Sequence, residues 1–383
     1  MSSINRFAFW LGLGGVLGLV VALAPRVGVT RFWYSALPDL PPQHGQPNPG
    51  VAGAFAGVSN GALLIAGGAN FPNGYPWQGG AKAWQPTVYI LAEAGKRLQW
   101  QPVGTLEKPL AYGASVVWNN QLIGLGGNDV TQRHASVFTL TWDAAARQLR
   151  TGALPALPLA LANQAAAVLG DMLYVFGGES DHGTEKSLYA LNLKAPATGW
   201  QKRADLPGPA RAFTALVAQG GALYVLGGRE TVSGTTTVFR DAYTYQPAQN
   251  SWAALPDLPT PLAAHSAAAN GAHSLLIFGG DDGVRLGQIE ALNRQLAALP
   301  AAADKSTLTQ QRNDLQAIHP GFRREVWEFR TDSRTWAVAD KLPFPTPVTT
   351  PVVRWGQQWI LPSGEVSPGI RTPTIWQVAV AKR

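Results

Sequence analysis

The chain of 383 residues contains no cysteine and only two methionines. The absence of thiols excludes disulfides, thiolate metal sites and cysteine nucleophiles. Charged residues make up only 14% of the sequence, and no block of Lys and Arg alternates with aromatic residues as a nucleic-acid groove requires. The formal net charge is nevertheless +7, which favours anionic small molecules or simply supports solubility. Composition therefore argues against nucleic acid as a partner and leaves an acidic small molecule open.

A short apolar run ending in Gly-Gly recurs along the chain. The spacing is about 50 residues, which is the length of a four-stranded propeller blade and not of a helical repeat. This pattern resembles the Kelch repeat. The second glycine of each copy is Gly68, Gly127, Gly178, Gly228 and Gly280, and a degenerate sixth copy ends at Gly364.

A Trp ahead of a Leu-Pro turn marks the outermost strand of each blade. It occurs near Trp100, Trp200, Trp252 and Trp336, and also at Trp33, where no blade precedes it. The last repeat, which runs to about residue 380, lacks such a strand. The sequence therefore predicts an all-β fold over residues 30–383, a six-bladed Kelch-type β-propeller whose N-terminal strand completes the C-terminal blade and removes the open sheet edges.

The first 29 residues have a different character. The segment from Phe7 to Ala24 carries no charge and is long enough, at roughly 1.5 Å per residue, to cross a thin bilayer. Ala22-Leu23-Ala24 resembles a signal-peptidase site, but Pro25 would hinder cleavage. Residues 1–29 are predicted to be a signal peptide or an N-terminal membrane anchor of an exported protein, with an intracellular tethered propeller as the alternative.

Blade five contains a long insertion, residues 283–323. Ile289, Leu292, Leu296 and Leu299 follow helical spacing before Pro300, and a second apolar series precedes Pro320. The pattern predicts a helical hairpin. Its role is either packing against a neighbouring blade or forming a wall or lid over the central pocket, and these two roles are compatible.

Candidate site residues are expected on one rim of the propeller. Because the strands are antiparallel, the connection entering each inner strand and the connection leaving each Gly-Gly strand open on the same side. Most of these residues are expected to be loop caps, with three or four contacting a ligand. The entering connections contribute Tyr112, Asn163, Arg211 and His265, and the leaving ones contribute Asn128, Glu179, Arg229, Asp281, Asp282 and Glu365.

The segment SGEVSPGIRT in the last blade places Glu365 and Arg371 on either side of a Ser-Pro-Gly turn. Such a turn returns the chain so that an acid and a guanidinium meet at the channel mouth. This pair could exchange a proton with a sugar hydroxyl and hold a substrate carboxylate, or it could be a structural salt bridge.

Several stretches carry a more specific resemblance. They are VAGAFAGVSNGALLIAGGANF, LAYGASVVWNNQLIGLGG, the blade-five insertion and SGEVSPGIRTPTIW, within a frame from Trp33 to Val380. The chain resembles the family of N-acetylneuraminate epimerase, a sialic acid mutarotase, and its cyclically permuted Kelch relatives. The blade order differs from that of the epimerase, as expected for circular permutation of a closed ring.

The resemblance implies a periplasmic propeller that interconverts the α and β anomers of sialic acid and needs no cofactor or metal. The family's catalytic Glu and Arg fall on Glu365 and Arg371. Arg211 takes the place of a family Arg, but the family's following Asp-Gln is Ala212-Phe213 here. That difference leaves the identity of the acidic sugar open.

The resulting hypothesis assigns roles as follows. Glu365 moves the proton, and Arg371, together with Arg211, binds the carboxylate; His265 and Tyr112 are candidates for a second proton-transfer group, and Asn163 is a candidate substrate-binding residue. The alternatives are a non-catalytic propeller that binds a glycan or protein at the same rim, or mutarotation of another acidic or acylated sugar. A copper radical oxidase is excluded, because its Tyr-Cys cross-link requires a cysteine. The sequence does not specify an oligomeric state.

Overall fold

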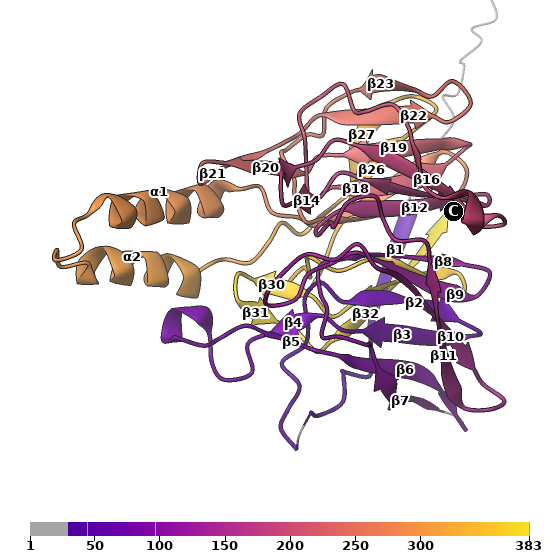
Figure 1. Cartoon of the computed structure of the whole chain (residues 1–383), viewed down its shortest axis with the longest axis horizontal. Coiled ribbons are helices and arrows are strands. Elements are labelled where there is room, and N and C mark those ends of the chain that lie inside the picture. The colour runs from indigo at the N-terminus through magenta and orange to yellow at the C-terminus, as the bar shows by residue number, and fades with distance from the viewer. Residues whose placement is uncertain (1–29, 44, 96, 383) are drawn as a thin grey trace, which may run out of the picture.

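The computed structural model describes residues 30–43, 45–95 and 97–382, and within them it contains six four-stranded antiparallel sheets (Figure 1). In each of the first five sheets the strands follow chain order from the inside outward. The six-bladed propeller predicted from the Gly-Gly repeat is confirmed. The predicted N-terminal segment, residues 1–29, lies outside the described residues.

The strands of the blades have the following bounds. Blade one contains β2 (Phe55–Ser59), β3 (Ala62–Ala66), β6 (Thr87–Ala94) and β7 (Arg97–Thr105). Blade two contains β8 (Ala114–Trp118), β9 (Gln121–Leu125), β10 (Val137–Asp143) and β11 (Gln148–Leu154). Blade three contains β12 (Ala165–Leu169), β13 (Met172–Phe176), β16 (Leu188–Asn192) and β17 (Gln201–Lys202). Blade four contains β18 (Ala215–Gln219), β19 (Ala222–Leu226), β22 (Ala242–Gln246) and β23 (Ser251–Leu255). Blade five contains β24 (Ser266–Ala269), β25 (Ser274–Phe278), β26 (Glu325–Arg330) and β27 (Thr335–Lys341). Blade six contains β28 (Val353–Trp355), β29 (Gln358–Pro362), β32 (Ile375–Lys382) and β1 (Thr30–Leu37).

Four short hairpins and the helices lie between these strands. The hairpins are β4 (Ala69–Asn70) with β5 (Ala83–Trp84), β14 (Glu179–Ser180) with β15 (Gly183–Thr184), β20 (Arg229–Val232) with β21 (Thr235–Val238), and β30 (Glu365–Ser367) with β31 (Ile370–Arg371). The helices are α1 (Val284–Ala298), α2 (Ser306–Ala317) and the short 3-10 helices η1 (Pro76–Gln78) and η2 (Pro196–Thr198). No helix of the described residues has both the length and the apolar character needed to cross a bilayer.

The N-terminal strand closes the ring as predicted. β1 pairs antiparallel with β32 over its whole length, from Thr30 opposite Lys382 to Leu37 opposite Ile375. The Tyr34 hydroxyl also donates to Asp340 of blade five at 2.7 Å, which ties β1 to the neighbouring blade. This pairing covers the edge of β32 that an incomplete blade would expose.

The Gly-Gly pairs mark places where two blades approach each other closely. Gly126 and Gly177 have positive φ. A Cβ on Gly126 would lie 2.5 Å from the Leu161 carbonyl oxygen of the next blade, and one on Gly177 would lie 2.4 Å from that of Arg211. The glycine that follows donates its N–H to the same carbonyl, as Gly127 does to Leu161 at 2.8 Å. Glycine is therefore required here both by the backbone conformation and by the space between blades.

In four of the blades, outer-strand tryptophans connect the blade to an earlier Leu-Pro turn. Their indole N–H groups donate to backbone carbonyls at 2.7–3.0 Å, from Trp100 to Pro38, Trp200 to Pro155, Trp252 to Ala204 and Trp336 to Pro256. The amphipathic indole suits this position, because its ring packs on the blade while its N–H finds an acceptor.

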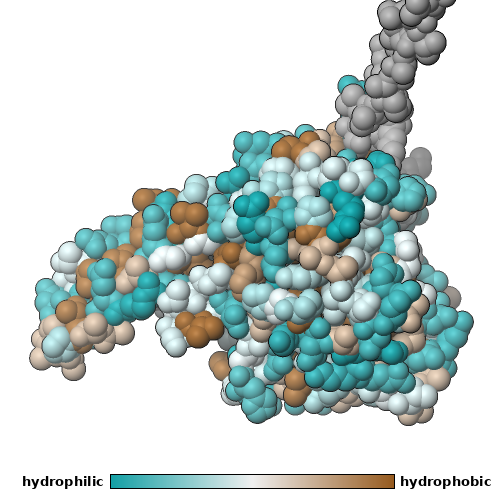
Figure 2. Space-filling model, turned by 90° about the horizontal axis from the view of Figure 1, so that it is seen from above, coloured by the Kyte–Doolittle hydropathy of each residue, from teal (hydrophilic) through white to brown (hydrophobic). Residues whose placement is uncertain are grey.

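The predicted helical hairpin of blade five is present and projects from the propeller as an arm (Figures 1 and 2). Ile289 is its one buried side chain among the described residues of α1 and α2. The base of the arm is braced on both sides of the rim. Glu290 accepts hydrogen bonds from the N–H and hydroxyl of Thr236 in β21, and Asn313 donates to the Trp77 carbonyl in η1.

Candidate active site

Six equivalent residues form a closed ring of backbone hydrogen bonds around the propeller axis. Each precedes an inner strand and has φ between 50° and 66°, in the left-handed region. The N–H of each donates to the carbonyl of its counterpart in the preceding blade at 2.7–3.2 Å. The six residues are Gly53, Tyr112, Asn163, Phe213, Ala264 and Thr349.

Next to this ring, the entering and leaving connections of every blade meet. An isolated antiparallel bridge joins the residue before each ring member to the residue after the Gly-Gly copy; the six bridges are Ala52–Ala69, Ala111–Asn128, Ala162–Glu179, Ala212–Arg229, Ala263–Asp281 and Val348–Glu365. The predicted common rim is thus confirmed.

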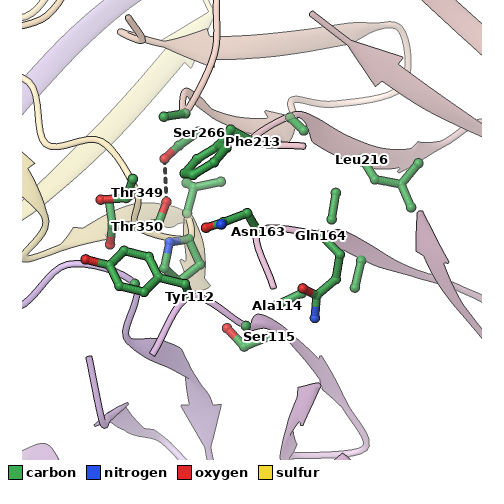
Figure 3. A pocket seen from close by; sticks show the side chains of 18 of the residues that line it. Tyr112, Ala114, Ser115, Asn163, Gln164, Phe213, Leu216, Ser266, Thr349 and Thr350 are labelled. Carbon is green, nitrogen blue, oxygen red and sulfur yellow. Dashed lines mark hydrogen bonds between the residues drawn. The ribbon is translucent and has the colours of Figure 1, made fainter. Parts of the chain in front are cut away.

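The ring lies between two cavities. One, of about 190 Å³, is the central channel among the inner strands, lined largely by small residues such as Ala114, Ser115 and Ser266 (Figure 3). Tyr112, Asn163, Phe213 and Thr349 contribute to both cavities. The other, of about 280 Å³, lies on the rim side beneath the base of the helical arm. We call this second one the rim cavity, and it is lined by Phe71, Pro76, Lys82, Tyr112, Asn128, Asn163, Phe213, Arg229, Gln316, Thr349, Glu365, Pro368, Gly369 and Arg371.

Glu365 and Arg371 meet in the rim cavity. They are opposite each other in the β30–β31 hairpin, and Arg371 Nη1 donates to Glu365 Oε1 at 2.6 Å. The N–H of Gly369 donates to the same oxygen at 2.7 Å. No hydrogen bond to Glu365 Oε2 is present among the described residues, so this oxygen is the one that remains for a ligand.

Arg371 also contacts the second blade. Its Nη2 donates to the phenol oxygen of Tyr112 at 3.3 Å, and its guanidinium lies over the Phe71 ring at 4.9 Å. Burial raises the pKa of Tyr112, although the charge of Arg371 opposes this shift. Tyr112 is therefore a neutral phenol throughout the neutral pH range, and its own O–H proton is available to a ligand.

Lys82, just before β5, brings a second cation to the same wall. Its Nζ lies 5.1 Å from the centroid of the Tyr112 ring and 5.5 Å from that of Trp84. Partial desolvation and then the charge of Arg371 lower the pKa of Lys82, against the opposing effect of Glu365. Among the described residues it has no carboxylate within ion-pair distance.

Polar groups from blades three and four form another part of the cavity wall. The Arg229 guanidinium stacks on Phe213 with its carbon 3.9 Å from the ring centroid, and its buried Nε has no partner among the described residues. Asn163 donates to Glu179 at 2.8 Å. Both sides of the rim cavity thus combine an aromatic ring with a cation.

Arg211 does not line the rim cavity. It is fully buried, and its two terminal nitrogens pair with the two carboxylate oxygens of Asp241 at 2.7 and 2.9 Å. It donates further to the carbonyls of Gly227 and Pro209. With these donors occupied inside the protein, Arg211 holds the start of blade four in place and is not positioned to bind a substrate.

His265 also lies apart from Glu365. It lines the central channel and not the rim cavity, one residue beyond the ring member Ala264. Its side chain is buried, and burial lowers its pKa to about 4. The ring of hydrogen bonds separates this neutral imidazole from the acid, so the structure brings together Tyr112, Asn163, Glu365 and Arg371 but neither His265 nor Arg211.

Lys82, Phe71 and Gln316 were not predicted from the sequence. In the leaving connections, the predicted candidates are the first residues after each Gly-Gly copy. Lys82 lies further along the chain, in the β4–β5 connection, and Gln316 lies in α2. The sequence signal for Lys82 was a cation following Gly79-Gly80 in a loop of the same rim.

Comparisons with known proteins agree with the fold and extend over most of the chain. The family model described as N-acetylneuraminate epimerase matches residues 24–149 and 154–383. Among curated proteins, the N-acetylneuraminate epimerase of Brucella melitensis is 31% identical over 232 residues, covering 57% of each chain. That of Yersinia enterocolitica is 39% identical over 124 residues, covering 30% of this chain and 31% of the relative.

The chain thus spans little more than half the length of the curated relatives that it matches. In three dimensions, the solved structure of YjhT matches with a TM-score of 0.62 and 15% identity, covering 90% of this chain and 99% of that one. At this identity the structural match is evidence for the fold alone.

Proposed function

Because this chain belongs to the N-acetylneuraminate epimerase family, we propose that it is a sugar mutarotase acting on N-acetylneuraminic acid or a related acidic sugar. The observation that carries the proposal is the contact between Glu365 and Arg371 in a cavity that also holds the neutral phenol of Tyr112. A carboxylate with one free oxygen and a phenol with one free proton are the base and acid that ring opening needs.

The reaction proceeds by two proton transfers in each direction. Glu365 Oε2 takes the proton of the anomeric hydroxyl, the bond between the anomeric carbon and the ring oxygen breaks, and Tyr112 donates its proton to that oxygen. The carbonyl group then rotates about its bond to the rest of the open chain. The ring hydroxyl returns its proton to Tyr112 as it attacks the other face of the carbonyl, and Glu365 returns its proton to the new anomeric oxygen.

Arg371 has a defined part in this cycle. It contacts both proton-transfer groups, at 2.6 Å from Glu365 and 3.3 Å from Tyr112, so its charge stabilises the phenolate that exists while the ring is open. Positioned acid and base groups contribute roughly 10²- to 10⁴-fold, which suffices for a reaction that already proceeds in water. This sequence of steps uses no cofactor.

The recessed position of the pair supports catalysis over a purely binding role. A binding propeller would present Glu365 and Arg371 on an open face, whereas here they line a cavity together with Pro76, Gln316 and Gly369. We also propose that the protein works in the periplasm. The uncharged segment from Phe7 to Ala24 and the family resemblance support this location.

The test is proton NMR of the decay of the α anomer of freshly released N-acetylneuraminic acid, with wild type, Glu365→Gln and Asp332→Asn. The last variant is the control, because it makes the same kind of change in the surface ion pair with Arg330. We expect acceleration by wild type and Asp332→Asn and its loss in folded Glu365→Gln. If folded wild-type protein gives no acceleration, N-acetylneuraminic acid is excluded as the substrate, and the same assay with other acidic sugars separates mutarotation of another sugar from the binding role.

A further inference from the structure

The rim cavity contains more positive than negative charge. Among its lining residues, Lys82, Arg229 and Arg371 face a single acid, Glu365, and that acid is paired with Arg371. Within the described residues neither Lys82 nor Arg229 has a carboxylate within ion-pair distance. Arg229 is partly buried and Lys82 is exposed, and neither charge is neutralised by an acidic partner in the part of the chain that the structure describes, so the net positive charge of the cavity is suited to an anionic ligand.

Lys82 is positioned by aromatic rings that leave its hydrogen-bonding capacity unused. Its ammonium lies near the rings of Tyr112 and Trp84, at 5.1 and 5.5 Å from their centroids. The Trp84 indole is itself held in place by its hydrogen bond to Asn128 at 3.1 Å. Cation–π contacts orient an ammonium but occupy none of its three N–H donors, which remain for a carboxylate.

The chemistry of the substrate decides between the two unpaired cations. In an acidic ketose such as N-acetylneuraminic acid, the carboxylate is bonded directly to the anomeric carbon. It must therefore lie next to the groups that move protons at that carbon. Lys82 satisfies this condition. Its ammonium lies 5.1 Å from the centroid of the Tyr112 ring, close enough to Arg371 and Glu365 for both charges to act on it.

Arg229 lies on a different wall of the cavity. It stacks on Phe213 in blade four, and blades four and one are opposite each other in a ring of six. Its guanidinium is therefore placed to contact the part of the sugar remote from the anomeric carbon. Arg371 is already engaged by Glu365, which leaves Lys82 as the cation next to the reacting atoms.

We propose that Lys82 is the specificity-determining residue of the rim cavity and that its ammonium receives the substrate carboxylate. The inference rests on the proposed function for the orientation of the sugar. It assigns to Lys82 the task that the sequence had assigned to Arg371 and Arg211. Arg371 then contacts Glu365 and Tyr112 and does not bind the substrate carboxylate. A neutral sugar lacks the contact with Lys82 that positions the anomeric carbon.

The experiment compares N-acetylneuraminic acid with its methyl ester, which has the same ring but no negative charge. Titration calorimetry measures the dissociation constants for wild type, Lys82→Gln and Lys108→Gln, and NMR measures the rate of anomer exchange for the same proteins. Lys108 is the matched control, an exposed lysine that does not line the rim cavity. Wild type and Lys108→Gln are expected to bind the acid about 10- to 100-fold more tightly than the ester, the range of a charge-assisted hydrogen bond. Lys82→Gln is expected to bind both with the affinity of the ester.

Each other outcome has a definite meaning. A full acid preference in Lys82→Gln overturns the assignment of Lys82, even if wild type is an active mutarotase. Wild type that binds the acid through Lys82 but does not accelerate anomer exchange overturns the proposed function and leaves the carboxylate site standing. Wild type that binds neither compound overturns both. Lys82→Arg restores the preference if charge is what matters, which separates loss of the ammonium from local misfolding.

Discussion

Tyr112 and Arg371 are 259 residues apart in the chain, and the phenol oxygen of the first accepts a hydrogen bond from Nη2 of the second at 3.3 Å. One belongs to the entrance of blade two and the other to the β30–β31 hairpin of blade six. They meet because those two blades flank blade one around the ring. The β30–β31 hairpin alone brings the acid and its guanidinium partner together, and ring closure brings the phenol to them.

Replacing Tyr112 with Phe should remove the proton donor and leave the fold intact. The aromatic ring of the phenylalanine would keep its close packing against Gly53. This packing is tight, because a Cβ added at Gly53 would lie 2.6 Å from Tyr112 Cδ1. We expect kcat for anomer exchange to fall about 100-fold or more, with little change in thermal unfolding. Tyr224→Phe, which removes a phenol oxygen outside the cavity, is the control. Near-normal kcat in Tyr112→Phe would assign the ring-oxygen proton to another group.

Binding of the acidic sugar should depend on the protonation of Lys82. Partial desolvation and the charge of Arg371 lower its pKa, whereas a bound carboxylate would favour the ammonium. Affinity should therefore be complete below the pKa of free Lys82 and decline as pH rises through it, beginning below the usual lysine value of 10.5. Calorimetry across this range should show the decline for the acid but not for the methyl ester. In Lys82→Arg the affinity should persist to higher pH, and a flat profile for wild type would contradict the role of Lys82.

The ion pair between Arg211 and Asp241 should contribute to stability and not to substrate recognition. Asp241→Asn leaves a fully buried guanidinium without its anion, so we expect a loss of about 3–5 kcal/mol in the free energy of unfolding. Burial opposes ionisation of Asp241, but the hydrogen bonds and charge of Arg211 outweigh it and lower its pKa. This stabilisation is therefore present above the unfolded-state pKa of about 3.9 and is lost as pH falls through the lower folded-state value.

Denaturant titrations at neutral and acidic pH measure the effect of the Arg211–Asp241 pair. The double variant Arg211→Met with Asp241→Asn should be less destabilised than Asp241→Asn alone, because no unpaired charge remains. An Arg211→Met protein with normal stability but a raised KM would instead show that Arg211 binds the substrate.

Removal of residues 1–37 should open the propeller. It deletes β1, exposes the edge of β32 along its length and breaks the contact between Tyr34 and Asp340. We expect a lower unfolding temperature and association through the free edge, measured by calorimetry and sedimentation. A chain that begins at residue 30 is the matched control, and a peptide of residues 30–37 should restore the truncated protein. Unchanged stability would mean that β1 is dispensable for closure.

The propeller was predictable because its backbone conformation requires particular residue types at particular positions. Gly126 and Gly177 leave no room for a Cβ, so each blade boundary is visible as Gly-Gly. The unpaired Trp strand at the N-terminus likewise predicted closure with the last blade. The contact between Glu365 and Arg371 was also predictable, because it depends only on the short β30–β31 hairpin.

Tyr112 and Asn163 line the rim cavity with Glu365 and Arg371, but His265 and Arg211 do not. Tyr112 and Asn163 are members of the hydrogen-bonded ring, whereas His265 is one residue after a ring member and Arg211 two residues before one. His265 directly precedes the inner strand β24, and it lines the channel with the first residues of that strand. Arg211 is directed to Asp241, a partner 30 residues further along the chain. Lys82 was missed because its loop returns to the cavity only in three dimensions.

The ring of six backbone hydrogen bonds forms the floor of the rim cavity, and its arrangement has an electrostatic consequence. All six hydrogen bonds of the ring run in the same sense, each N–H donating to the preceding blade. Their dipoles thus point head to tail around a circle, and vectors arranged in this way nearly cancel. A helix N-terminus attracts anions with unpaired N–H groups and an aligned dipole, whereas this floor has neither. The ring therefore adds little to the proposed attraction for a carboxylate, so substitution of a few charged side chains that line the cavity should weaken or reverse that attraction.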